Sequence, residues 1–106
     1  MNNTSIAAKK ALKELVNYSV ITFSSMTIKE RENIIDEVGF AEFVSDSIEH
    51  CNSSEDYSMC KIIYSGSNES NKCTENRVDR TIDLSYKYID KLTTLLYNIY
   101  RLSVND

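Results

Sequence analysis

Apolar residues recur every three or four positions along most of the chain, which is the spacing of amphipathic helices. A first helix can begin at a Thr or Ser cap near residue 4 and run to about Phe23. Thr27 followed by Glu30 has the sequence of a capping box, so we expect a second helix from Ile28, with Gly39 at its C-terminus. Its inward positions would be Ile34, Ile35 and Val38. In the first helix, the inward positions would be Leu12, Leu15, Val16, Ser19 and Phe23.

The clearest amphipathic pattern covers residues 40–51. At about 100° per residue, the apolar side chains fall on one arc and the acidic side chains on the opposite arc. The apolar arc holds Phe40, Phe43, Val44, Ile48 and Cys51. The acidic arc holds Glu42, Asp46 and Glu49. We expect a further short helix, carrying Met59, Ile62 and Ile63, to begin near Ser53 and end at Gly66.

The longest helix is predicted from about Asn76 to Ser103. Its seam consists of Ile82, Ser85, Ile89, Leu92, Leu96 and Ile99. A second stripe consists of Leu84, Tyr88, Leu95 and Leu102. So wide an apolar surface suits a helix at the centre of a bundle. The alternative is that part of this surface forms a homodimer interface. We predict one all-α domain over residues 1–106, a bundle of four to five helices with a long C-terminal helix and a flexible loop at about 65–76.

The composition agrees with this helical assignment. The chain has 106 residues, no proline and two glycines, so it lacks the residues that punctuate multi-stranded β folds. The N-terminus does not have the pattern of a secretory signal, and no apolar run reaches the length of a membrane span. We therefore expect a cytoplasmic protein without a membrane partner.

The stretch "EHCNSSEDYSMC" raises the question of a chemical site. His50 and Cys51 point about 100° apart on a helix, so they cannot easily form a nucleophile pair. Zinc binding by His50, Cys51, Cys60 and Cys73 lacks the usual ligand spacing. A Cys51–Cys60 disulfide could join two helix ends, but free thiols are the expectation in a reducing cytosol. We predict a protein that is not an enzyme, with no catalytic residue, no metal site and no cofactor.

Charge is distributed unevenly along the chain. Between residues 32 and 60 there are eight acidic residues and no Lys or Arg, whereas the rest of the chain carries a net charge of +4. The eight are Glu32, Asp36, Glu37, Glu42, Asp46, Glu49, Glu55 and Asp56. Nucleic-acid binding by this segment is disfavoured, because phosphate contacts need basic side chains. A concentrated acidic surface instead attracts a basic protein, although an ordinary solvated helix face is the alternative.

The chain has the size, the acidic middle segment and a residue usage rich in Asn, Ile, Ser, Lys and Tyr, as expected of an AT-rich coding sequence. In these respects it resembles the small acidic immunity proteins of contact-dependent inhibition and nuclease-bacteriocin systems. The resemblance implies a cytosolic protein that neutralises one cognate basic toxin, with a nuclease as the expected toxin. The partner-binding residues predicted from charge are Glu32, Asp36, Glu42, Asp46, Glu49, Glu55 and Asp56. The alternative is a phage or large-virus helical adaptor that binds a host protein through an apolar groove, with exposed tyrosines such as Tyr86, Tyr97 and Tyr100 beside it.

Overall fold

The computed structural model describes residues 3–54, 60–66, 71–75 and 80–104 of the 106-residue chain. The elements in chain order are α1 (Asn3–Ser24), α2 (Ile28–Glu32), α3 (Glu37–Ser53), β1 (Lys61–Ile63), β2 (Cys73–Glu75), β3 (Arg80–Asp83) and α4 (Tyr86–Val104). The chain is mostly helical, as predicted, and a long helix does lie at its C-terminal end. The prediction of an all-α fold is wrong, because the described residues also include a three-stranded sheet.

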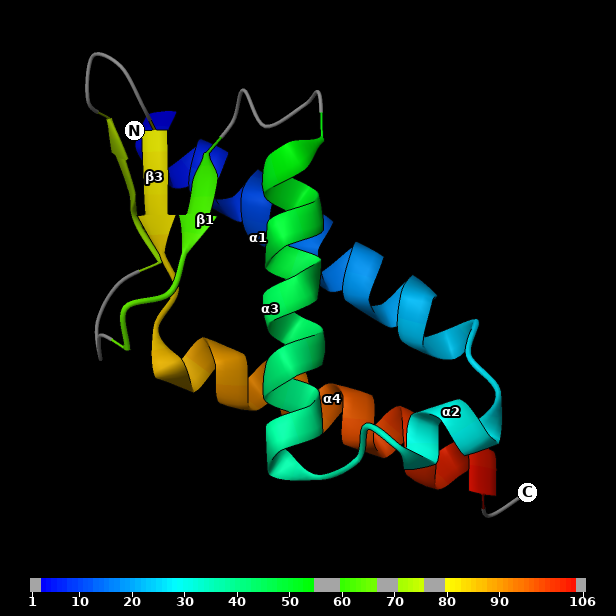
Figure 1. Cartoon of the computed structure of the whole chain (residues 1–106). Helices are drawn as coiled ribbons and strands as arrows, with labels where there is room; N and C mark the ends of the chain where they lie inside the picture. Colours follow the sequence, from blue (N-terminus) through cyan, green and yellow to red (C-terminus); the bar gives the residue numbers. More distant parts are fainter. Residues whose placement is uncertain (1–2, 55–59, 67–70, 76–79, 105–106) are drawn as a thin grey trace.

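The helices enclose the main core. In Figure 1, α3 crosses α1 and α4, and the short α2 lies beside the C-terminal end of α4. Leu15 and Phe23 of α1 are fully buried, and the Phe23 ring packs against the rings of Phe40 and Phe43 from α3. The predicted inward faces of the first and third helices are therefore confirmed.

The sheet covers the other end of the molecule (Figure 1). Its order is β1-β3-β2, with β3 parallel to β1 and antiparallel to β2. In this register Ile82 is paired with both Ile62 and Cys73, and all three side chains are buried. One inward residue from each strand thus forms a row that extends the helical core into the sheet.

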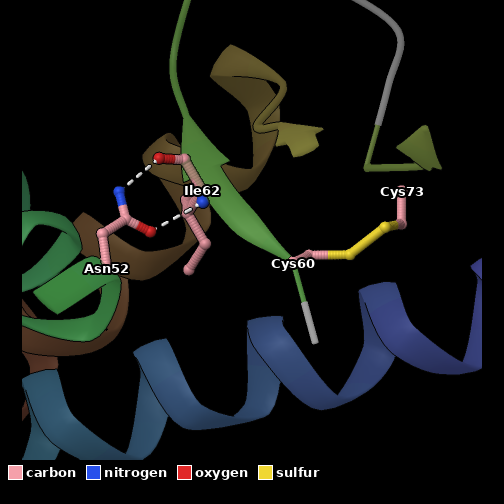
Figure 2. Close-up of a disulfide and its surroundings, with 4 residues drawn as sticks. All are labelled: Asn52, Cys60, Ile62 and Cys73. Carbon is pink, nitrogen blue, oxygen red and sulfur yellow. Dashed lines mark hydrogen bonds between the residues drawn. A yellow bond between two sulfur atoms is a disulfide. The ribbon is translucent and has the colours of Figure 1, made fainter. Parts of the chain in front are cut away.

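Two contacts fasten β1 (Figure 2). The Asn52 side chain at the end of α3 accepts a hydrogen bond from the Ile62 amide (2.8 Å) and donates one to the Ile62 carbonyl (2.7 Å). A disulfide joins Cys60, just before β1, to Cys73, the first residue of β2. Asn52 therefore forms with the Ile62 amide and carbonyl, on the outer edge of β1, the hydrogen bonds that a neighbouring strand would form.

Two segments predicted as helix have β structure instead. Ile62 and Ile63 lie in β1, and Ile82 lies in β3, so the C-terminal helix begins at Tyr86 rather than near Asn76. Met59 is outside the described residues, and the predicted flexible loop at about 65–76 contains β2 at its end. Strands of three or four residues show too little periodicity to be recognised, and their pairing depends on residues far away in the sequence.

The expected second helix is also divided. Its capping box is confirmed, with the Thr27 and Glu30 side chains bonded to each other's backbone amides, but α2 ends at Glu32. Ile34 and Ile35 pack against the core, whereas Val38 is 67% exposed. Gly39 lies in the first turn of α3 and not at a helix C-terminus, because Asp36 caps a new helix there.

The expectation of unpaired cysteines is wrong for Cys60 and Cys73, and a Cys51–Cys60 pair is not formed. Cys51 is a free, buried thiol. Free thiols are the expectation for a reducing cytosol, whereas protein disulfides persist mainly in oxidising compartments. No helix among the described residues is long and apolar enough to cross a bilayer.

Candidate acidic docking surface

The candidate site is the solvent-facing side of α3. Asp36 is the N-cap of the helix, and its carboxylate accepts a hydrogen bond from the Gly39 amide at 2.5 Å. Its inward side consists of Phe40, Phe43, Val44, Ser47 and Cys51, all buried. This burial fixes the rotation of the helix, so Glu42, Asp46 and Glu49 are exposed on the opposite side.

An open hollow of about 540 Å³ lies on this face. It is lined by Glu37, Val38, Ala41, Glu42, Ser45 and Asp46. Three carboxylates therefore line the hollow together with the exposed Val38 and Ala41 side chains. The sequence of α3 contains no Lys or Arg that could neutralise these carboxylates from within the helix. Such a surface offers a basic partner both charge and a small apolar contact.

The predicted partner-binding residues do not all belong to this surface. Glu42 and Asp46 line the hollow, and Glu49 is exposed one turn further along the same helix. Asp36 is an N-cap, so its carboxylate is engaged in holding the start of α3. Glu32 is exposed but ends α2, apart from the α3 face. Glu55 and Asp56 lie outside the described residues.

Glu37 lines the hollow but was absent from the predicted site. It was counted in the acidic segment, yet the predicted helix boundary at Gly39 placed it on the helix before α3. The signal that could have placed it was Asp36, a residue type favoured at the N-cap, which starts a helix at Glu37.

A second depression lies between the start of α3 and the middle of α4. This groove has a volume of about 260 Å³ and is lined by Ile35, Glu37, Phe40, Thr93, Thr94 and Tyr97. Tyr97 is 43% exposed, and its ring lies 6.4 Å from that of the half-buried Tyr100. Because Glu37 lines both the groove and the acidic hollow, the two depressions adjoin at the first turn of α3.

His50 and Cys51, which the sequence raised as a possible nucleophile pair, have packing roles in the structure. The His50 ring stacks on Tyr18 of α1, with centroids 4.0 Å apart and an interplanar angle of 11°. Burial, with a smaller contribution from the Glu14 charge, raises the pKa of the Cys51 thiol. This thiol is therefore protonated near neutral pH, when a nucleophile would need to be a thiolate.

The four residues considered for zinc are also divided between other roles. Cys60 and Cys73 share a disulfide and so cannot serve as thiolate ligands in this form. Within the described ranges, no three His, Cys, Asp or Glu side chains are grouped so that they could hold a metal ion.

No protein-family model, curated protein or solved structure matches this chain.

Proposed function

We propose that this protein is a non-enzymatic binding protein whose α3 face captures a basic protein partner. The observation that carries the proposal is the open hollow lined by Glu37, Glu42 and Asp46 together with exposed Val38 and Ala41. Like-charged side chains held on one rigid helix repel one another, and a basic partner would relieve this repulsion. The helix is held from behind by buried Phe40, Phe43 and Val44, so the surface is preorganised.

The partner class that fits is a cognate toxin, which the protein would neutralise as an immunity protein. The general resemblance in size and acidity supports this assignment, and the acidic face gives it a physical basis. The predicted cytoplasmic location belongs to the same proposal. The Cys60–Cys73 disulfide argues for an oxidising compartment instead, and the docking mechanism is the same in either place.

The acidic face can be tested by paired charge reversals. Glu42→Lys with Asp46→Lys removes two carboxylates of the hollow, and Glu32→Lys with Asp90→Lys makes the same change in net charge at exposed positions outside it. Association with the product of the adjacent reading frame is measured by surface plasmon resonance at several salt concentrations. We expect the first pair to slow association about tenfold or more at low salt and to weaken its salt dependence.

The control pair should change association much less. Equal effects of the two pairs would mean that net charge, rather than the α3 face, determines binding. A growth assay tests the toxin assignment separately, because co-expression should rescue cells from the toxicity of that neighbouring product. Binding without rescue would leave the docking surface in place and reject the immunity role.

The second candidate function, a phage or large-virus adaptor that binds a host protein, is favoured by a different observation. The groove between α3 and α4 is lined by Ile35, Phe40 and Tyr97, and Tyr86 is also exposed on α4. Binding through this groove alone would depend on apolar contact and would be nearly independent of salt, so the same salt series discriminates the two functions.

A further inference from the structure

The acidic hollow and the apolar groove form one composite surface. Glu37 lines both, and it carries the one charge among the described residues that line the groove. Glu42 and Asp46 line the hollow, whereas Ile35, Phe40 and Tyr97 line the groove. Two depressions of such different chemistry, joined at one residue, can be occupied by a single continuous segment of a partner.

We infer that the partner presents a basic segment with one apolar anchor, a Leu- or Phe-sized side chain that enters the groove while Lys or Arg side chains reach the hollow. This inference rests on the proposed function and adds the chemistry of the bound segment. Charge complementarity selects a cationic segment, because every charged side chain lining either depression is a carboxylate. The apolar lining selects the anchor, since Ile35, Phe40 and Tyr97 have no charge to offer.

The geometry of α3 sets the spacing. Glu42 and Asp46 are five and nine residues beyond Glu37, which corresponds to roughly 8 and 14 Å along a helix axis at 1.5 Å per residue. A partner helix that runs along α3 would place basic side chains one and two turns from its anchor, at roughly 5 and 11 Å, and the length of Lys and Arg side chains covers the remaining distance. The volume of the groove, about 260 Å³, suits a single apolar side chain.

The test uses the full chain, labelled with ¹⁵N, and two synthetic helical peptides. Both carry Lys one and two turns after a central position, which is Leu in the first peptide and Ala in the second. We expect the Leu peptide to bind about tenfold more tightly, as the burial of one such side chain implies. It should shift the amide signals of Thr93 and Tyr97 together with those of Ala41 and Glu42, whereas the Ala peptide should shift only the last two.

A groove-filling variant supplies an independent check. Thr94→Trp adds an indole at an exposed position that lines the groove, and Thr94→Ser is the matched control at the same position. Thr94→Trp should reduce the affinity of the Leu peptide to that of the Ala peptide and leave the Ala peptide unaffected. Circular dichroism establishes that each variant keeps the helical content of the parent.

The possible outcomes separate the two proposals. Equal affinity of the two peptides, with signal changes confined to α3, would overturn the anchored-segment inference and leave the acidic docking surface intact. Failure of both peptides to bind at low salt would reject both. Binding of the Leu peptide that is unchanged by Glu42→Lys with Asp46→Lys would overturn the requirement for a basic segment.

Discussion

The guanidinium of Arg31 lies over the ring of Phe23, 5.6 Å from its centroid, and its Nε donates a hydrogen bond to the Phe23 carbonyl at 3.0 Å. The same group donates to the Ser24 carbonyl at 2.6 Å and to the Ser103 hydroxyl of α4. Arg31 is buried, and these partners are neutral. The carbonyls at the C-terminal end of α1 supply the negative potential that a carboxylate would otherwise provide. One side chain of α2 therefore joins the ends of α1 and α4.

Replacing Arg31 by Met should destabilise the fold by about 3 kcal/mol, because three charged hydrogen bonds are lost and the α1 carbonyls lose their donors. Urea unfolding followed by circular dichroism measures the change. Arg101→Met, at an exposed position in the last turn of α4, is the control and should shift stability by less than about 0.5 kcal/mol. Similar effects of the two variants would show that the Arg31 contacts contribute little.

Gly39→Ala tests how closely the chain approaches itself before α3. Alanine has about 1 kcal/mol better helix propensity than glycine. A Cβ at position 39 would nevertheless lie 2.3 Å from the Ile34 carbonyl oxygen, so the backbone must move. We expect a net loss of about 2 kcal/mol in the free energy of unfolding. Stabilisation by this substitution would contradict the close approach. Ala41→Gly, an exposed site on the same helix, should cost only the propensity difference.

Asn52→Ala should free the edge of β1. The two hydrogen bonds to Ile62 would be lost, at a cost of about 2 kcal/mol. Hydrogen exchange measured by NMR should show faster exchange of the Ile62 amide. Ser53→Ala is the neighbouring control, because the exposed Ser53 hydroxyl donates only to its own helix, at the His50 carbonyl. Unchanged protection of Ile62 in the Asn52 variant would show that the side chain does not fasten the strand.

The disulfide should be detectable by thiol counting. Of the three cysteines, only Cys51 should react with a thiol reagent in non-reducing denaturant, and all three should react after reduction. Cys60→Ser with Cys73→Ser should lower the free energy of unfolding by about 3 kcal/mol, because the unfolded chain loses a loop closure. Cys51→Ala leaves the disulfide intact and serves as control. Three reactive thiols before reduction would disprove the pairing.

The buried Tyr88 hydroxyl should make the fold less stable at alkaline pH. Its hydroxyl donates to the Leu12 carbonyl at 3.2 Å, and burial raises its pKa from 10.0 to about 12. A folded pKa above the unfolded value means that the folded state holds the proton more tightly. This contribution is complete below pH 10 and is lost as the pH rises towards 12. At pH 8 Tyr88→Phe should be less stable than the parent by about 1 kcal/mol, because it lacks the hydrogen bond, and its stability should decline less between pH 10 and pH 12.

Much of the helical framework could be predicted from the sequence. The capping box at Thr27 and the inward face of residues 40–51 depend on contacts within a few residues, so local spacing reveals them. The same spacing placed Glu42, Asp46 and Glu49 on the exposed side of α3. Whether these acids bind a partner is a proposal that the charge pattern and the hollow support.

Tertiary structure alone decided the sheet, the disulfide and the shape of the candidate site. Ile62, Cys73 and Ile82 form one buried row only after Ile82 has paired with residues 9 and 20 positions before it, an event that short apolar runs do not encode locally. The sequence by itself determined which face of α3 is acidic, because helical periodicity is local. It could not determine that Glu37 joins this face to a groove on α4, because that junction depends on how two helices pack against each other.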